Sequence, residues 1–294
     1  MLRSQATTRL IIAGASGLVG RRLSAVAAAA ALPVLGTSSR TVPGMLPLDL
    51  RRAENFDYSR LGPGDVIALT AGISAPDACA REPERVRRVN VEGTARFISG
   101  ALAQGARVIF FSSDTVYGER EGPFDEAATC APHGVYAQMK HEVERRFDAH
   151  PGVKALRLSY VFCSEDGFTR YLRDCAASAR AAEVFHPFYR AVVHREDVVQ
   201  AVIALAAHWE SFPAFAVNCG GPHVLSRIDF VQAMKDAVLP TLESRIVDPG
   251  DAFFTHRPRR IGMRSPRLAE LLGRPPRALG DAISAEFGAT AGPA

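Results

Sequence analysis

The chain has 294 residues, a formal net charge of +4 at pH 7 and a composition that is 47% hydrophobic. This length is sufficient for one complete core with a smaller second lobe. The arginines are scattered rather than clustered, which disfavours nucleic-acid binding, and no apolar run reaches the ~18 residues of a membrane span.

The five cysteines include no C-x-x-C pair and are odd in number. They therefore favour buried free thiols in a reducing compartment over a zinc site or a disulfide framework. Residues 1–8 are too few and too polar to form a signal peptide. We expect a cytoplasmic protein that does not bind membranes.

The first predicted strand, residues 9–13, leads into three evenly spaced glycines and then a predicted helix over residues 18–31. In such a unit the first glycine permits a tight turn, and the second lets backbone N–H groups approach a pyrophosphate. The third lets the helix pack close to the strand. The alternative is a plain turn into an alanine-rich helix. The residues expected to contact a dinucleotide are Gly14, Ser16, Gly17, Leu18, Val19 and Gly20.

The second predicted strand, residues 33–37, ends in Thr37-Ser38-Ser39-Arg40. A site selective for NAD usually has an acidic residue here for the ribose 2′-OH. Hydroxyls and a guanidinium suit a 2′-phosphate instead. Ser38, Ser39 and Arg40 therefore favour NADP(H) as cofactor and leave NAD(H) open. The alternative is a polar loop whose arginine faces water.

Strands and helices continue to alternate along the chain. Further strands are predicted at 65–69, 107–112 and 154–158, and helices at 81–103 and 134–149. This order predicts an α/β fold with a Rossmann-type, doubly wound parallel sheet. We expect residues 1–160 to form the NADP-binding domain, joined by parts of 185–218. A smaller, mostly substrate-binding lobe is expected over 161–294, with helices at 168–181, 226–237 and 266–273.

Tyr136 and Lys140 lie four residues apart on the predicted helix 134–149, so their side chains share one face. A free tyrosine has a pKa of about 10 and is a poor acid at neutral pH. A nearby cation lowers that pKa, and burial opposes the shift. The pair is typical of a tyrosine that exchanges a proton with a carbonyl or an alcohol.

Together with four further motifs, these features resemble the extended short-chain dehydrogenase/reductase family. Within it, the chain is most similar to the dTDP-4-dehydrorhamnose reductase-like and NAD-dependent epimerase group, over about residues 9–287. The further motifs are Pro47-Leu-Asp49-Leu50, Leu69-Thr70-Ala71-Gly72, Asn90-Val-Glu-Gly93-Thr94 and Phe111-Ser112-Ser113-Asp114-Thr115-Val116-Tyr117-Gly118.

The resemblance implies a catalytic group of four residues. Tyr136 is expected to donate the proton, and Lys140 to lower the pKa of Tyr136 and bind the nicotinamide ribose. Ser113 is expected to hydrogen-bond the reacting oxygen, and Asn90 to support Lys140 through a water. The resemblance also implies cofactor contacts for Asp49, Leu50, Thr70, Ala71, Gly72, Tyr136 and Lys140, with Asp49 against the adenine.

Substrate residues are implied mainly in the second half of the chain. Arg190 opens a segment, running to Val198, whose leading arginine binds the substrate diphosphate in the family. Arg257 takes the place of a second such arginine, and the alternative is that both are solvated loop residues. Ser74 and Asp114 fall at substrate-facing positions of the reductases. Ala80 replaces a glutamate that is associated with a metal in some members, so we predict no metal.

The sequence therefore predicts an NAD(P)-dependent oxidoreductase that reduces the 4-keto group of a nucleotide-activated sugar. An epimerase on the same fold is an alternative, as is a non-catalytic regulatory protein that binds a dinucleotide. A dehydratase is disfavoured because Ser113-Asp114-Thr115 contains no glutamate. A reductase of small carbonyl compounds is a further alternative, against which Arg190 argues. A nucleotide sugar is the expected partner, and a homodimer is left open.

Overall fold

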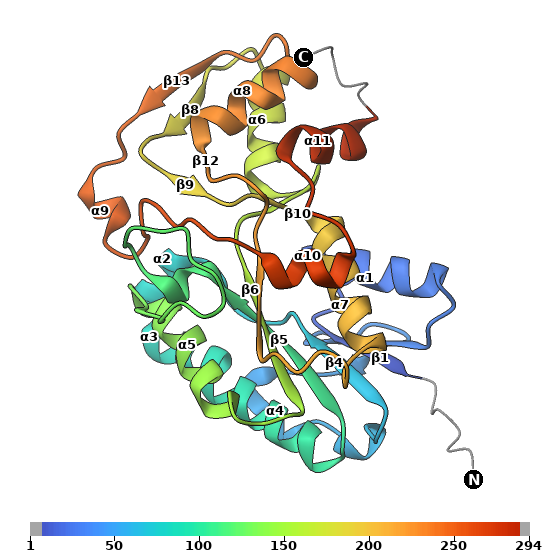
Figure 1. The fold of residues 1–294 in the computed structure, drawn as a ribbon. Coiled ribbons are helices and arrows are strands. Elements are labelled where there is room, and N and C mark those ends of the chain that lie inside the picture. The colour runs from blue at the N-terminus through green and yellow to red at the C-terminus, as the bar shows by residue number, and fades with distance from the viewer. Residues whose placement is uncertain (1–7, 289–294) are drawn as a thin grey trace. The chain divides into compact units, whose positions relative to one another are not determined.

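The structure is a computed structural model that describes residues 8–288. The chain divides into two compact units. The first consists of the part up to Ser112 with Val135–Leu156 and Val199–Val217. The second consists of Ser113–Gly134, Arg157–Val198 and the part from Asn218 onward. The ribbon in Figure 1 labels the main elements of both.

A seven-stranded sheet has the order β11-β6-β5-β4-β1-β2-β3. Its strands are β1 (Arg9–Ala13), β2 (Val34–Ser38), β3 (Leu46–Pro47), β4 (Asp65–Leu69), β5 (Arg107–Ser113), β6 (Val153–Leu158) and β11 (Ala216–Cys219). The central strand β1 is parallel to both neighbours, with Ile11 opposite Leu35 of β2 and Ile67 of β4. The order reverses beside β1, as in a Rossmann sheet, which confirms the predicted α/β fold.

The helices of the first unit lie where they were predicted, with small shifts of their bounds, and the short helix Pro76–Arg81 was not predicted. They are α1 (Leu18–Ala29), α2 (Pro76–Arg81), α3 (Pro83–Arg87), a π-helical segment η3 (Arg88–Gly93), α4 (Thr94–Ala103) and α5 (Val135–Phe147). The helix predicted over 81–103 corresponds to the uninterrupted helical run of α3, η3 and α4, which begins at Pro83 rather than at residue 81. Proline lacks an N–H and fits the first turn of a helix, so the run starts there. Short 3-10 turns are η1 (Leu50–Asn55), η2 (Tyr58–Arg60) and η4 (Asp114–Tyr117), the last in the second unit.

The second unit packs helices around small sheets. Its helices are α6 (Gly167–Ala177), α8 (Arg227–Ala237), α9 (Asp251–Phe254), α10 (Pro266–Leu272) and α11 (Leu279–Phe287). Two-stranded sheets pair β7 (Val161–Phe162) with β10 (Val193–His194), β9 (Tyr189–Arg190) with β12 (Leu225–Ser226), and β8 (Ala182–Phe185) with β13 (Ser244–Val247). Helix α7 (Arg195–Ala207), which was not predicted, runs from this unit into the first.

Each unit has its own hydrophobic core. In the first, Ile11, Ile67 and Val108 of the sheet pack with Phe97 and Ile98 of α4. In the second, a separate cluster contains Phe162, Leu172, Phe230, Met234 and Ile283. All five cysteines are free thiols, and four of them are buried. Among residues 8–288, no helix combines the length and apolar character needed to cross a membrane.

Candidate active site

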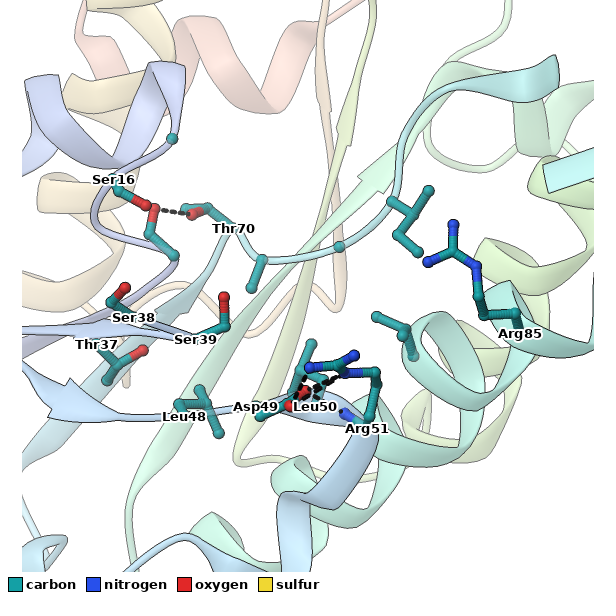
Figure 2. Close-up of a pocket in the computed structure, with 16 residues that line it drawn as sticks. Ser16, Thr37, Ser38, Ser39, Leu48, Asp49, Leu50, Arg51, Thr70 and Arg85 are labelled. Carbon is teal, nitrogen blue, oxygen red and sulfur yellow. Dashed lines mark hydrogen bonds and ion pairs between the residues drawn. The ribbon is translucent and has the colours of Figure 1, made fainter. Parts of the chain in front are cut away.

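A cavity of about 390 Å³ opens at the ends of β1, β2 and β4 in the first unit (Figure 2). The predicted cofactor residues that line it are Gly14, Ser16, Gly17, Ser38, Ser39, Asp49, Leu50, Thr70, Ala71 and Gly72. Leu18, Val19, Gly20, Arg40, Tyr136 and Lys140 are not part of the lining. Thr37, Leu48, Arg51, Ile73, Arg85 and Val89 line it without having been predicted.

The glycine turn that borders this cavity has the geometry of a dinucleotide cradle. Gly14 has φ +96°, which other residues rarely adopt, and a Cβ there would lie 2.7 Å from Thr70 Oγ1. A Cβ at Gly20 would collide with the carbonyl oxygen of Gly14, so α1 can approach the turn only without a side chain at that position. The backbone N–H of Gly17 donates to Gly14 O at 3.0 Å and closes the turn.

One buried polar atom of the cavity lacks a partner. The Thr37 hydroxyl is shielded from solvent and has no hydrogen-bond partner among residues 8–288. Buried polar groups are nearly always satisfied, so an orphan hydroxyl on a residue of the cavity lining calls for a partner that the described residues do not supply. With the glycine cradle at the start of α1, it shows that these residues fit a dinucleotide.

The loop after β2 divides into an enclosed and an exposed part. Ser38 is buried, and its hydroxyl accepts a hydrogen bond from the Arg40 backbone N–H at 3.0 Å. Ser39 lines the cavity. The Arg40 side chain is exposed and outside the lining, so it could reach a 2′-phosphate only from the rim.

Two arginines on the wall of the cavity were missed in the sequence analysis. Arg51 forms an ion pair with Asp49, with 2.7 Å between Nη2 and Oδ2, and holds the pKa of that carboxyl below its usual value. Arg85 of α3 reaches toward the cavity from another element, as Figure 2 shows, and its Nε lies 2.5 Å from a carboxylate oxygen of Glu82. Nothing in the local sequence distinguishes them from other surface arginines, because Arg51 of η1 and Arg85 of α3 come to line one cavity only in the fold.

Tyr136 and Lys140 lie on one face of α5, as their spacing predicts. Lys140 is only 7% exposed, and its Nζ lies 5.8 Å from the centroid of the Tyr136 ring. Nζ donates a hydrogen bond of 2.6 Å to the carbonyl oxygen of Phe111 on β5. Burial lowers the pKa of Lys140 to about 8, and the charge of Glu144 opposes that shift.

Lys140 adjoins the dinucleotide cavity through Gly72. A Cβ placed on Gly72, which lines the cavity, would lie 3.9 Å from Lys140 Nζ and 3.3 Å from Asn90 Oδ1. Asn90 is buried, and its amide accepts from the N–H of Ile73 at 2.9 Å and donates to the carbonyl of Ile73 at 2.8 Å. Asn90 therefore fixes the turn after β4, beside Lys140.

Ser113 and Asp114 begin the second unit in a buried, hydrogen-bonded group. Ser113 Oγ donates to Asp114 Oδ1 at 3.2 Å and accepts from Thr115 Oγ1 at 3.0 Å. Ser159 Oγ donates to Asp114 Oδ2 at 2.8 Å. Burial raises the pKa of Asp114, and the charge of Arg190 opposes that rise, with Arg190 Nε 3.7 Å from Oδ2.

Arg190 and Arg257, the two predicted substrate arginines, belong to one local network. Arg190 Nη2 donates to the carbonyl of Pro258 at 2.8 Å, next to Arg257 in the chain. Each guanidinium lies over an aromatic ring, Arg190 at 4.3 Å from the Phe188 centroid and Arg257 at 4.4 Å from that of Phe253. Ser74 is exposed in the first unit, just before α2, and lies outside the cavity lining.

A second cavity, of about 340 Å³, lies wholly within the second unit. Five aromatic side chains and two charged ones line it: Phe168, Tyr171, Phe185, Phe188, Phe253, Glu183 and Arg227. A narrower cavity shares Phe188 and Arg227 with it and also contains Arg190. These aromatic residues and Arg227 were not predicted, because they come from α6, β8, α8, α9 and the segment between β8 and β9.

Comparison with protein families identifies one match over nearly the whole chain. The family described as RmlD substrate binding domain matches residues 8–282. The chain belongs to this family. The predicted resemblance to the dTDP-4-dehydrorhamnose reductase-like group of extended short-chain dehydrogenases/reductases is thereby confirmed.

Known relatives of this RmlD-family chain include a reductase and a protein named as an enzyme subunit. It is 29% identical to the dTDP-4-dehydrorhamnose reductase of Mycolicibacterium smegmatis over 78% of its own length and 69% of that protein's. It is 24% identical to methionine adenosyltransferase 2 subunit beta of Rattus norvegicus over 90% of its own length and 82% of the relative's. The aligned regions include most of both units.

The fold is also that of a solved protein described as MoeE5 in complex with UDP-glucose and NAD. The two structures superpose with a TM-score of 0.80 at 20% identity, over 96% of this chain and 97% of the other. This likeness supports the Rossmann architecture of the family member described here.

Proposed function

We propose that this protein is an NADPH-dependent reductase of the 4-keto group of a nucleotide-activated deoxysugar. The observation that carries the proposal is the position of Lys140. It shares a helical face with Tyr136, is buried, and adjoins Gly72 in the wall of a cavity that fits a dinucleotide. The reductase from M. smegmatis, which is 29% identical, supports the choice of reaction and substrate class.

The first unit would bind the cofactor, which supplies the hydride when bound. Tyr136 donates a proton to the oxygen that becomes the product hydroxyl. The Lys140 ammonium favours the tyrosinate that remains, because a cation lowers the free energy of a nearby anion. Ser113, by its place in the motif, is assigned to hydrogen-bond the same oxygen. Asn90 positions the turn at Ile73 and does not touch the reacting atoms.

The direct test is turnover of dTDP-4-keto-6-deoxyglucose with NADPH, followed by the loss of absorbance of the reduced nicotinamide. Stoichiometric formation of a 4-hydroxy sugar supports the reductase. Isolation of the protein with firmly bound NAD, together with interconversion of sugar epimers without net NADPH consumption, would establish the epimerase instead.

Selectivity for NADP(H) rests on Ser38, Ser39 and Arg40. We expect Arg40→Ala to weaken NADPH binding more than NADH binding, because only NADPH carries the 2′-phosphate. Titration of both reduced cofactors into the wild type and the variant measures this. Arg60→Ala, which removes another exposed arginine of the same unit, is the control. Wild-type protein that binds NADH at least as tightly as NADPH contradicts the assignment.

A regulatory protein that binds a dinucleotide without turnover is the second candidate. It is favoured by the likeness, over 90% of the chain, to a protein named as a subunit of a different enzyme, methionine adenosyltransferase 2 subunit beta. The retained Tyr136 and Lys140 argue for the enzyme, because a protein that only binds needs no proton donor. A protein that binds NADPH tightly but reduces neither a nucleotide 4-keto sugar nor a small ketone would support the regulatory role.

A further inference from the structure

A cavity of about 400 Å³ adjoins the dinucleotide cavity and lies wholly within the first unit. Four arginines and one carboxylate line this arginine cavity: Asp49, Arg51, Arg52, Arg85 and Arg88. Asp49, Arg51 and Arg85 also line the dinucleotide cavity, whereas Arg52 and Arg88 do not. Figure 2 shows Arg51 and Arg85 approaching the dinucleotide cavity from two different elements.

The four arginines come from two segments that the fold holds at close range. Arg51 and Arg52 are neighbours in η1. Arg85 of α3 and Arg88, the first residue of η3, are three residues apart in one helical run and therefore share a face. A Cβ at Gly93 of η3 would lie 1.7 Å from the first carbonyl oxygen of η1, so only a glycine allows this approach. The contact fixes the spacing between the two arginine pairs.

Two of the four arginines have carboxylate partners. Asp49 accepts from the backbone N–H of Arg51 at 2.9 Å and pairs with its guanidinium, with 2.7 Å between Nη2 and Oδ2. Arg85 Nε lies 2.5 Å from Glu82, an exposed residue outside the lining. Asp49 is thus the only carboxylate among the residues that line the arginine cavity, and it is already paired.

The other two arginines are available to a ligand. The exposed side chains of Arg52 and Arg88 form no hydrogen bond or ion pair with residues 8–288. Arg52 acts on Asp49 and Glu54 through charge alone, and Glu54 is paired with Arg96 at 2.7 Å. A single exposed arginine without a partner is ordinary. Four guanidinium groups on one cavity with one carboxylate give a local excess of positive charge, which attracts anions.

We propose that the arginine cavity binds a phosphate-bearing polyanion beside the dinucleotide. The guanidinium fork matches phosphate oxygens in geometry and charge, and two pairs of forks suit more than one phosphate group. Ser38 and Ser39, which are assigned to the 2′-phosphate, do not line the arginine cavity, and neither does the glycine turn at Gly14 and Gly17. The anion is therefore distinct from the phosphates of the cofactor.

This anion site gives the first unit a means of regulation. Arg51 and Arg85 line both cavities, so an anion that contacts them changes the charge at the edge of the dinucleotide cavity. Any such effect on cofactor affinity is reciprocal, because the two binding equilibria are linked. The inference needs only the geometry of the first unit and does not depend on the reductase assignment.

Calorimetric titration of inorganic pyrophosphate, in metal-free buffer at fixed ionic strength, tests the site in the full chain. Arg52→Met and Arg88→Met should each weaken pyrophosphate binding about three- to tenfold, and the double variant about ten- to a hundredfold. Arg145→Met removes an exposed arginine of α5 outside both linings and should bind pyrophosphate like the wild type. NADPH affinity verifies the folding of each variant, since none of the three positions lines the dinucleotide cavity.

The same titration in the presence of NADH or NADPH shows where the pyrophosphate binds. For a separate site, the apparent Kd of pyrophosphate stays constant or reaches a limiting value as the cofactor saturates. An unlimited rise with both cofactors would place pyrophosphate in the glycine cradle, and a rise with NADPH alone would place it at the 2′-phosphate position. Either result overturns the inference.

Two further results would also contradict it. Wild-type protein that does not bind pyrophosphate has no such site. Equal losses in Arg88→Met and Arg145→Met would show that pyrophosphate responds only to the overall charge of the protein. Turnover of the nucleotide 4-keto sugar is measured without pyrophosphate, so each of these results leaves the reductase assignment standing.

Discussion

Lys140 holds its charge in a buried position beside the Tyr136 ring, where it would stabilise the tyrosinate that remains after Tyr136 donates a proton. We therefore expect Tyr136→Phe to abolish turnover, because the hydroxyl that supplies the proton is gone, while NADPH affinity stays close to that of the wild type. Steady-state kinetics and cofactor titration measure the two effects. Tyr58→Phe, in the same unit as Tyr136 and outside the cavity lining, is the matched control for a lost hydroxyl. Retention of most of kcat in Tyr136→Phe contradicts the assignment.

The lowered pKa of Lys140 makes a prediction about stability. Its pKa is about 8 in the folded protein and 10.5 when unperturbed, so between these values the unfolded chain binds more protons. The free energy of unfolding should therefore rise with pH across this window, on the order of 3 kcal/mol in total. Below about pH 8 the buried Lys140 charge destabilises the fold, and the stabilisation gained at higher pH is absent.

Chemical denaturation of wild type and Lys140→Met from about pH 7 to about pH 10 measures this contribution. The wild type should gain stability relative to the variant as the pH rises, because the variant has no proton to lose. A pH-independent difference between the two proteins would show that Lys140 does not titrate in this window.

At the scale of single residues, sequence spacing was informative where the geometry is local. Tyr136 and Lys140 are four residues apart, and helical periodicity alone brings them to one face. Arg51 and Arg227 were not predicted, because the cavities that they line are assembled from distant segments. In the sequence, Arg227 stands at the start of a predicted helix, a position at which arginines are usually exposed to solvent. Its enclosure by Phe168 and Phe188 exists only in the folded unit.

At the scale of elements, the start of the helical run at Pro83 has a clear cause, and the π-helical turn within that run has a consequence. Pro83 is visible in the sequence, and proline is compatible only with the first turn of a helix. The π-helical turn Arg88–Gly93 is not visible in the sequence, because hydrophobic periodicity does not distinguish a single wide turn. That turn carries Asn90, whose amide holds Ile73 by two hydrogen bonds.

Asn90→Ala should therefore loosen the turn after β4. Two buried hydrogen bonds are lost, and the N–H and carbonyl of Ile73 are left without partners, so we expect roughly tenfold weaker NADPH binding. Isothermal titration measures it, and Asn55→Ala, at an exposed asparagine of the same unit, is the control. If Asn90→Ala lowers kcat strongly while NADPH affinity is unchanged, Asn90 acts on the reaction rather than on the cofactor turn.

At the scale of the whole molecule, the alternation of strands and helices predicted a doubly wound sheet. The strand order of that sheet reverses beside β1, as the glycine motif predicts. The two cavities of the second unit could not be predicted in the same way. Their walls come from short elements, α6, α8, α9 and the segment between β8 and β9, whose apolar residues also fit an ordinary core.

Substitution of Arg190 tests whether the second unit binds the substrate. Arg190→Ala should raise KM for a nucleotide 4-keto sugar about ten- to a hundredfold with a smaller change in kcat, because the diphosphate is bound alike in the ground and transition states. NADPH binding should be unchanged. Activity equal to that of the wild type on the nucleotide sugar, or a strong wild-type preference for small ketones, would favour a general carbonyl reductase.

The cavity that fits the dinucleotide is lined by the first unit alone, and the aromatic cavity with Arg227 by the second unit alone. Neither cavity therefore needs a ligand in the other cavity to complete its walls. Binding should then follow no obligatory order: initial-rate kinetics would show a random sequential mechanism, and product inhibition by NADP⁺ would be competitive only toward NADPH. It also means that a nucleotide mimic and a cofactor mimic should inhibit independently, with effects that multiply when both are present.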